Sequence, residues 1–331
     1  MTLEELFKEF KKKKIVVLGD VMIDAYMWGS VKRVSPEAPV PIVNLTKQED
    51  RLGGAANVAL NLVSLGAEVT IASVVGDDKE ATTLLELLEK DKILTTGVLQ
   101  SKDRITTVKT RVLGNYQQLL RIDQEQTDDI HSADENRLLK NVEKLFQKGQ
   151  DAIILQDYNK GVLTDSLIKK VIALAKQYNV IVTVDPKQKN FLSYEGVTLF
   201  KPNLKELAEG VQLAIDFSKN RDDFEKAVVK LKEIIKPEII FVTLSEFGVF
   251  IENHKDSHYI PAHKRTISDV SGAGDTVISV ATLCLTAGLD VKNVAEMANL
   301  AGGIVCEYRG VVAINADQLF DEANKKGLNV V

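Results

Sequence analysis

The sequence has few cysteines, no long apolar run and no leader-like start, and each of these absences narrows what the protein can be. Its 331 residues include two cysteines, Cys284 and Cys306, which lie far apart in apolar stretches. This favours buried free thiols in a reducing compartment over a disulfide or a zinc site. No apolar run approaches the roughly 18 residues that a membrane span needs, and the start is amphipathic, unlike a signal peptide. We therefore expect a cytoplasmic protein with no membrane partner.

An excess of basic residues is also missing. Lysine and arginine total 42 against 47 acidic residues, which gives a net charge of −5. A chain of this charge has no general attraction for polyanions, so nucleic acid is not an expected partner. Any binding of phosphate must come from a local arrangement of groups.

Short apolar runs alternate with longer helical patterns along the chain. Strands are expected at residues 15–20, 69–75, 152–155, 180–184, 197–200 and 239–244, and helices at 53–65, 79–90, 132–147, 164–177, 221–235, 273–287 and 291–306. Because the strands lack polar alternation and are separated by helices, they predict a mostly parallel sheet covered on both faces. The expected fold class is α/β, a three-layer α/β/α doubly wound sheet in a single domain spanning 1–331.

Two segments interrupt this alternation. Residues 31–46 contain three prolines around an extended apolar piece, and residues 104–123 hold two β-rich runs joined at Gly114 and Asn115, as in a hairpin. We expect both segments to form strands of a small β lid inserted into the domain. The exposed strand edges of such a lid can pair between subunits, so a homodimer is the expected assembly.

The strongest chemical signal lies at residues 269–275, which read Asp-Val-Ser-Gly-Ala-Gly-Asp. The glycines allow a sharp turn at the start of an apolar helix, where the amides of Gly272, Ala273 and Gly274 can gather around an anion. Asp275 beside such a site can take a proton from an acceptor hydroxyl, which makes it the candidate catalytic base. The alternative is a strand-to-helix turn in which the aspartate only caps the helix.

Three further motifs offer polar groups near strand ends or helix starts. Gly53 and Gly54 open a helix that carries Asn57, although small residues there also suit close helix–sheet packing. Asp24 follows the first strand, where ligands bind in doubly wound sheets, and can accept hydrogen bonds from sugar hydroxyls or cap a turn. Asn203 and Glu206 are spaced to face one pocket, and the same spacing fits a helix capping box, so both interpretations stay open.

These pieces together resemble the ribokinase-like sugar kinases of the phosphofructokinase-B family over about residues 13–320. The resemblance implies ATP and Mg²⁺ as cofactors, Asp275 as the base and the glycine turn as the anion hole. It also implies that Glu206 holds Mg²⁺ through water and that Asp269 is the candidate ligand of a monovalent cation, K⁺. The nucleotide-binding residues that it implies are Asn203, Leu204, Lys205, Glu206, Thr243, Ser245, Gly248 and Asn299.

Within that family the chain is most similar to the kinase half of the heptose-7-phosphate kinase/adenylyltransferases. The strings that carry this similarity lie at residues 19–24, 33–41, 115–123, 157–161 and 185–187, while Ser271 stands where threonine is usual. The resemblance implies phosphorylation of the C1 hydroxyl of D-glycero-β-D-manno-heptose 7-phosphate, in the synthesis of ADP-heptose and the lipopolysaccharide core. A nucleotidyltransferase half does not follow in the sequence, so we expect the kinase step alone, with a separate adenylyltransferase in the pathway.

A phosphorylated substrate needs cations at its far end. Lys109 and Arg111 share one face of an expected lid strand, because strand residues two apart point the same way. The full set of candidates for the 7-phosphate is Arg104, Lys109, Arg111, Arg121, Lys160 and Lys187. Each of them can instead be a solvated surface charge.

Three other functions stay open as alternatives. One is a kinase of the same fold that acts on another sugar, sugar phosphate or nucleoside. The second is a non-catalytic sugar-binding protein, which an intact Asp275 and glycine turn disfavour. The third is a nicotinamide-dependent oxidoreductase, which the lack of a glycine fingerprint after the first strand disfavours.

Overall fold

A computed structural model describes residues 1–115 and 117–328. Its main sheet runs in the spatial order β13 (Ser257–Ile260), β12 (Val249–Glu252), β11 (Ile239–Thr243), β10 (Leu199–Phe200), β9 (Ile181–Asp185), β8 (Ala152–Gln156), β1 (Lys14–Gly19), β4 (Glu68–Gly76) and β5 (Leu94–Ser101). Neighbours from β11 to β5 pair in parallel, whereas β12 and β13 are added antiparallel at one end. The mostly parallel sheet predicted from the apolar runs is confirmed.

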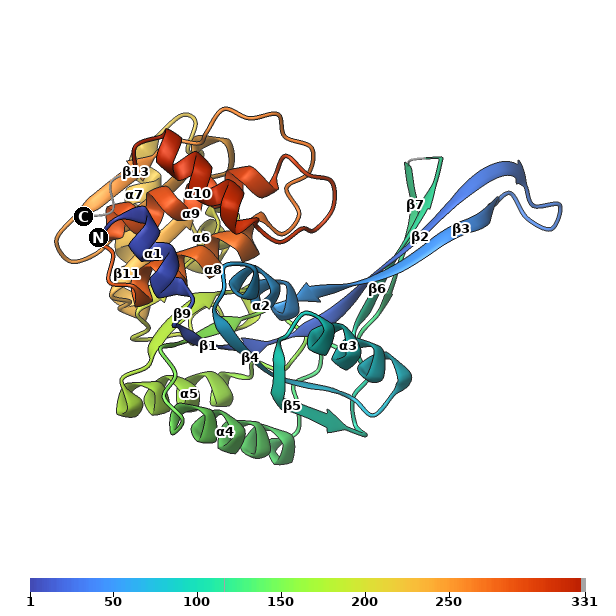
Figure 1. Cartoon of the computed structure of the whole chain (residues 1–331), viewed down its shortest axis with the longest axis horizontal. Coiled ribbons are helices and arrows are strands. Elements are labelled where there is room, and N and C mark those ends of the chain that lie inside the picture. The colour runs from blue at the N-terminus through green and yellow to red at the C-terminus, as the bar shows by residue number, and fades with distance from the viewer. Residues whose placement is uncertain (116, 329–331) are drawn as a thin grey trace.

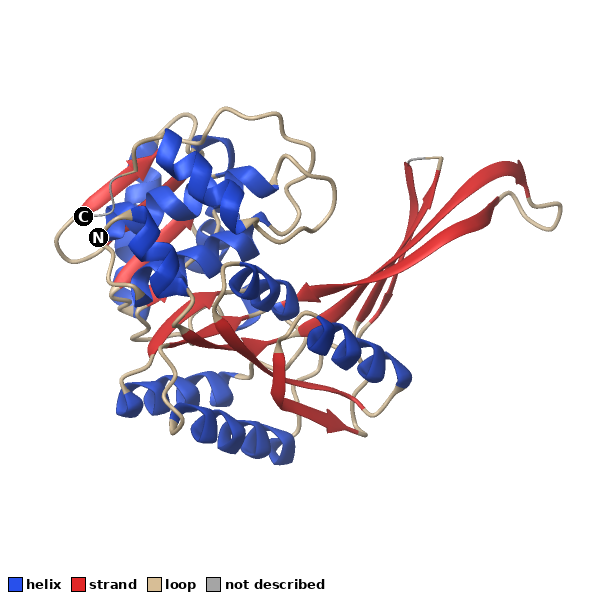
Figure 2. Ribbon diagram, viewed as in Figure 1, coloured by secondary structure: helices blue, strands red, loops and turns tan. Residues whose placement is uncertain are grey.

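Helices cover both faces of this sheet (Figure 2). One face packs against α1 (Leu3–Phe10), α2 (Ala55–Ser64), α3 (Lys79–Lys90), α8 (Ala273–Thr286), α9 (Val291–Val305) and α10 (Ala316–Lys325). The other packs against α4 (Ser132–Phe146), α5 (Asp165–Tyr178), α6 (Leu204–Val211) and α7 (Arg221–Ile235). Along β1, Ile15 and Val17 lie in the first core and Val16 and Leu18 in the second, so the strand is apolar throughout because both of its faces are buried.

A second sheet projects from one side of this body (Figure 1). It consists of β3 (Pro41–Gly54), β2 (Val21–Val34), β6 (Val108–Gly114) and β7 (Gln117–Gln124), in that spatial order. The lid was predicted at 31–46 and 104–123, and the structure corrects both bounds. β2 and β3 extend the lid to residues 21–54, and β6 begins only at Val108 because Arg104 turns into the body.

Across the described ranges, none of the helices combines the length and the apolar character that crossing a bilayer demands.

The body depends on a close approach between β1 and β8 at Gly19. A β-carbon on Gly19 would lie 1.9 Å from the backbone oxygen of Gln156, a contact that no rotamer change can relieve. We therefore predict that Gly19→Ala lowers the free energy of unfolding by about 3 kcal/mol, the upper range for overpacking. Urea denaturation of the purified chain measures this.

Gly149→Ala is the matched control, since Gly149 has φ +78° and no atom within 4 Å of the added β-carbon. That substitution should lower the free energy of unfolding by only about 1 kcal/mol, because alanine is strained in a left-handed backbone conformation. Equal losses at the two positions would show that the β1–β8 approach is looser than described.

Candidate active site

The glycine turn lies at the N-terminus of α8 as expected. Gly272 is the N-cap residue with φ +79°, a left-handed conformation that favours glycine. The amide of Ala273 donates to Val270 O at 3.3 Å, so this amide is already used within the turn. Across the described residues, the amides of Gly272 and Gly274 make no such bond, and together with the helix dipole they can receive an anion.

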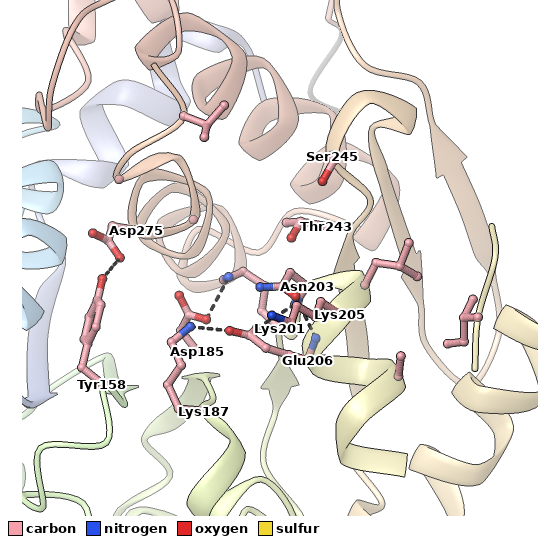
Figure 3. Close-up of a pocket in the computed structure, with 16 residues that line it drawn as sticks. Tyr158, Asp185, Lys187, Lys201, Asn203, Lys205, Glu206, Thr243, Ser245 and Asp275 are labelled. Atoms are coloured by element: carbon pink, nitrogen blue, oxygen red, sulfur yellow. Dashed lines mark hydrogen bonds and ion pairs between the residues drawn. The ribbon is translucent and has the colours of Figure 1, made fainter. Parts of the chain in front are cut away.

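Asp275 lies in the first turn of α8 with its carboxylate in the wall of a cleft of about 720 Å³. The side chain is 6% exposed and accepts hydrogen bonds from three directions. Asn57 Nδ2 donates to Oδ2 at 2.7 Å, while the Tyr158 hydroxyl and Gln156 Nε2 donate to Oδ1 at 2.7 and 3.3 Å. Figure 3 shows Tyr158 pointing at this carboxylate. The arrangement fixes the orientation of the carboxylate before any substrate arrives.

The surroundings of Asp275 also set its basicity. Burial raises its pKa to about 6, although the hydrogen bonds from Asn57 and Tyr158 act in the opposite direction. Asp185 raises the pKa further and Lys201 lowers it. A carboxylate with this pKa is ionised at neutral pH and is a stronger base than an exposed aspartate, which suits general base catalysis.

The loop after β8 positions Tyr158. The buried carboxylate of Asp20 accepts the backbone amides of Tyr158, Lys160 and Val162 at 2.9, 3.0 and 3.0 Å. One side chain at the end of β1 therefore holds the loop that carries both Tyr158 and Lys160.

The nucleotide residues expected from the resemblance lie along the same cleft (Figure 3). Those that line it are Asn203, Leu204, Lys205, Glu206, Thr243 and Ser245. Gly248 and Asn299 line an adjoining cavity of about 560 Å³, which shares Thr243, Ser245 and Gly274 with the cleft. The two cavities are therefore neighbours, and both are lined by Gly274 of the glycine turn.

The Asn203–Glu206 pair is a capping box as well as part of the cleft wall. Asn203 Oδ1 accepts the Glu206 amide at 2.8 Å, and Glu206 Oε2 accepts the Asn203 amide at 2.9 Å. The other carboxylate oxygen, Oε1, pairs with Lys187. The described residues contain no cluster of three or more acidic, histidine or cysteine side chains that would enclose a metal ion. One carboxylate in an open cleft fits Mg²⁺, which is usually held by phosphates, water and one or two carboxylates.

Four residues that complete the site were not among the predicted site residues. Besides Tyr158 and Gln156, they are Lys201 and Asp185, a buried ion pair with 3.0 Å between Nζ and Oδ1. A β-carbon on Gly274 would lie 3.7 Å from Lys201 Nζ, so this pair stands beside the glycine turn. The feature that could have identified these four residues in the sequence is their position, because all four lie at or just beyond the carboxyl ends of β8, β9 and β10.

The sugar side of the site differs from the expectation in one respect. Asp24 is not a turn residue after β1 but part of β2, where Oδ1 pairs with Arg111 Nη1 at 2.6 Å. A β-carbon on Gly53 would come within 2.6 Å of the same carboxylate, and one on Gly54 within 2.4 Å of Asp20 O. Gly53 thus allows β3 to pack closely on β2 within the lid, and Gly54 allows a close approach to Asp20 where the lid joins the body. Their role in substrate binding stays a prediction.

The six cations predicted to hold a substrate phosphate divide into groups. Arg104 is buried and donates from Nη1 to Asp128 O at 2.6 Å and from Nη2 to Lys160 O, so it supports the loop and is not free for a ligand, contrary to prediction. Lys187 lines the cleft and pairs with Glu206, so its role with a substrate phosphate stays a prediction. Arg111, Lys109, Arg121 and Lys160 all pair with acidic residues of the lid or its base, at Asp24, Asp123 and Glu125.

Asp269, the predicted cation ligand, stabilises the turn. Its Oδ1 accepts the amide and hydroxyl of Ser271 at 2.9 and 2.8 Å, and its Oδ2 accepts the Gly310 amide at 3.0 Å. Burial raises the pKa of Asp269, but these bonds outweigh it and leave the pKa lowered. A role with K⁺ stays a prediction.

A parallel sheet, a glycine turn at a helix start and a tuned aspartate in a long cleft define a phosphoryl-transfer enzyme of the α/β class. A model of the pfkB family carbohydrate kinases matches residues 12–318, and the chain belongs to this family. It is an ATP-dependent sugar kinase.

Relatives in sequence agree with this family. The chain is 40% identical over 311 residues to "Bifunctional protein HldE" of Aliarcobacter butzleri, covering 94% of this chain and 64% of that protein. It is 41% identical over 310 residues to the protein of the same name from Methylobacillus flagellatus, covering 93% and 62%. The chain thus spans less than two thirds of the length of these relatives.

Solved structures with the same fold include phosphofructokinase-2 from Escherichia coli in complex with fructose-6-phosphate. Its TM-score is 0.75 at 17% identity, covering 94% of this chain and 99% of that one. Arabidopsis thaliana ribokinase complexed with ribose and ATP gives 0.72 at 16% identity, covering 93% and 98%. At this identity the likeness shows the fold alone.

The hydrogen bond from Tyr158 leads to a prediction about pH. Tyr158→Phe removes a bond that lowers the pKa of Asp275, so the pKa rises. Because a base must be deprotonated, the acid limb of the kcat profile should move to higher pH by about half a unit to one unit, the value of one hydrogen bond. Activity well above the limb should be largely kept.

Tyr178→Phe provides the control, because Tyr178 is remote from the cleft and accepts a hydrogen bond from Gln147. Its acid limb should coincide with that of the wild type. An unchanged limb in Tyr158→Phe would mean that this hydroxyl does not influence the catalytic carboxylate.

Proposed function

We propose that the protein transfers the γ-phosphoryl group of ATP to the C1 hydroxyl of D-glycero-β-D-manno-heptose 7-phosphate and forms the 1,7-bisphosphate. The observation that carries the kinase chemistry is the Asp275 carboxylate beside the Gly272–Gly274 turn at the end of the cleft. The similarity of the lid and loop strings to heptose-7-phosphate kinases supports the sugar, and so does the match to proteins named HldE. The reaction would serve the synthesis of ADP-heptose for lipopolysaccharide.

Groups of this chain would assist the proposed phosphoryl transfer. The C1 oxygen attacks the γ-phosphorus, its proton passes to Asp275, and the bond from the γ-phosphorus to the β-phosphate oxygen breaks to release ADP. The amides of Gly272 and Gly274 face the charge on the transferring group, and the nearby Lys201 adds a positive charge. Positioning and electrostatics of this kind supply most of the catalysis in phosphoryl transfer.

The nucleotide would lie along the cleft with its base in the cavity at Asn299 and its phosphates between Asn203 and the turn. Glu206 would hold Mg²⁺ through water, and Lys187 would leave its pairing with that carboxylate to meet the phosphates. When bound, Mg²⁺ neutralises charge on the β- and γ-phosphate oxygens. Asp269 stays the candidate for a monovalent cation that stabilises the turn.

The role of Asp275 is tested by removing its charge. Asp275→Asn keeps the size of the side chain but cannot accept the proton, so kcat should fall by about 10²–10⁴-fold, the range for a lost general base. The KM for ATP should change little. Release of ADP is followed in a coupled assay with heptose 7-phosphate, fructose 6-phosphate and ribose, and heptose 7-phosphate should give the highest kcat/KM.

Asp290→Asn makes the same substitution at the N-cap of α9, away from the cleft, and should leave kcat unchanged. Near-wild-type turnover by Asp275→Asn would end the assignment of the base. A preference for fructose 6-phosphate or ribose would replace the heptose with another sugar and leave the kinase chemistry intact.

We also propose that the lid pairs with the lid of a second copy of this chain. The face opposite Lys109 and Arg111 carries Leu120 and Ile122, which are 55% and 53% exposed and lie opposite Val112 and Thr110 of β6. This apolar face lies on a sheet that extends away from the body (Figure 1), where its own chain leaves it uncovered. An exposed apolar sheet face of this kind is typical of an interface.

Ile122→Asp should therefore convert the dimer to a monomer in sedimentation equilibrium, because it places a charge in the buried interface. Val229→Asp, on the far side of the body in α7 and also 55% exposed, should leave the dimer intact. A wild-type chain that sediments as a monomer would refute the pairing.

A further inference from the structure

The base of the lid contains a carboxylate shared by two lysines. Glu125, just after β7, accepts from Lys109 Nζ through Oε2 at 2.8 Å and from Lys160 Nζ through Oε1 at 2.8 Å. The lysine side chains are each 15% exposed and that of Glu125 is 23% exposed. This is a partly buried cluster in which each carboxylate oxygen has its own ammonium group, an arrangement stronger than a surface ion pair.

The three residues come from different parts of the molecule. Lys109 belongs to β6 of the lid, whereas Lys160 belongs to the body, where Asp20 holds its amide and Arg104 its carbonyl group. The ammonium of Lys160 is therefore on a fixed backbone, two residues beyond the Tyr158 that contacts Asp275. Lys109 lies opposite Asp24 in the lid sheet. The cluster thus bridges the lid and the body, on the loop that also brings Tyr158 to Asp275.

Glu125 stays ionised at neutral pH. Burial raises its pKa, but the hydrogen bonds from Lys109 and Lys160 outweigh burial and leave the pKa lowered. Asp123 also pairs with Lys109, at 3.1 Å. The two lysines are therefore neutralised while no substrate is bound.

We propose that Glu125 is an internal anion that occupies the phosphate subsite of the sugar phosphate. The substrate phosphate displaces this carboxylate from Lys109 and Lys160 and takes over both ammonium groups. The inference rests on the proposed function for the identity of the sugar, but the subsite itself would serve any sugar phosphate of suitable length.

The exchange explains how the site can select phosphorylated sugars. A phosphate carries more negative charge than a carboxylate and offers three acceptor oxygens, so it can replace Glu125 on both lysines. A neutral sugar cannot, and the Glu125 ion pairs then persist. Because one lysine is on the lid and the other on the body, the bound phosphate maintains the bridge between the two parts that Glu125 makes without substrate.

The test removes the internal anion and follows the KM of the sugar phosphate. Glu125→Gln keeps the shape of the side chain without its charge, so the KM for heptose 7-phosphate should fall about threefold to tenfold, while the KM for ATP stays the same. Lys160→Met should raise the KM for the sugar phosphate by a similar factor or more and should lessen the preference for phosphorylated over unphosphorylated heptose. Glu125→Asp should return the KM toward the wild-type value.

Asp123→Asn is the matched control, since Asp123 pairs with Lys109 and Arg121 and has no contact with Lys160. The same loss of charge there should change the KM less than Glu125→Gln does. Equal effects at the two positions would show that the KM responds to the overall electrostatic field and not to a specific phosphate subsite. That result would overturn the inference.

Binding of inorganic phosphate separates this inference from the proposed function. With the nucleotide site filled by a non-hydrolysable ATP analogue and Mg²⁺, calorimetry should show tighter phosphate binding in Glu125→Gln and weaker binding in Lys160→Met than in the wild type. If the wild type does not turn over heptose 7-phosphate but phosphate binding follows this order, the sugar is wrong and the subsite stands. If heptose 7-phosphate is turned over but both variants bind phosphate like the wild type, the subsite is wrong.

Discussion

The site depends on keeping one charged carboxylate at the edge of a buried core. Asp275 is almost fully buried, and burial alone would favour its neutral form. Asn57 from α2, Tyr158 from the loop after β8 and Gln156 from the end of β8 supply the hydrogen bonds that keep it ionised near neutral pH. These donors reach Asp275 only because the sheet and its helices bring distant segments of the chain together. The ionisation of this carboxylate therefore depends on the fold.

A second buried carboxylate, Asp20, links the surroundings of Asp275 to the base of the lid. By accepting three amides of the loop at 158–162, it fixes Tyr158 on the side of the base and Lys160 on the side of the lid. On that side Glu125 pairs with Lys109 and Lys160, while Asp24 forms a separate pair with Arg111. In the reaction that we propose, the orientation of the catalytic base and the recognition of the sugar phosphate would therefore both depend on this loop.

The elements that were predicted correctly from the sequence are those that local sequence patterns determine. Apolar runs and turn residues gave β1, β4, β8, β9 and β11, because strands buried on both faces are apolar throughout. β5, β12 and β13 were missed, since they are short or partly exposed. The glycine turn and Asp275 are local features and were found, whereas the contact between Asn57 and Asp275 spans 218 positions and has no local signal. The sequence also did not reveal that Arg104 binds backbone carbonyl groups. A count of charges cannot distinguish such a guanidinium from one that faces a ligand.

The proposed chemistry requires the phosphoryl group in transfer to lie between Asp275 and the amides of the glycine turn. A crystal structure with ADP, Mg²⁺, aluminium fluoride and the sugar phosphate would show this directly. We expect the acceptor oxygen at about 3 Å from the Asp275 carboxylate and the fluoride atoms at about 3 Å from the amides of Gly272 and Gly274. An acceptor oxygen beyond hydrogen-bonding reach, with Asp275 still bonded only to Asn57, Tyr158 and Gln156, would contradict it.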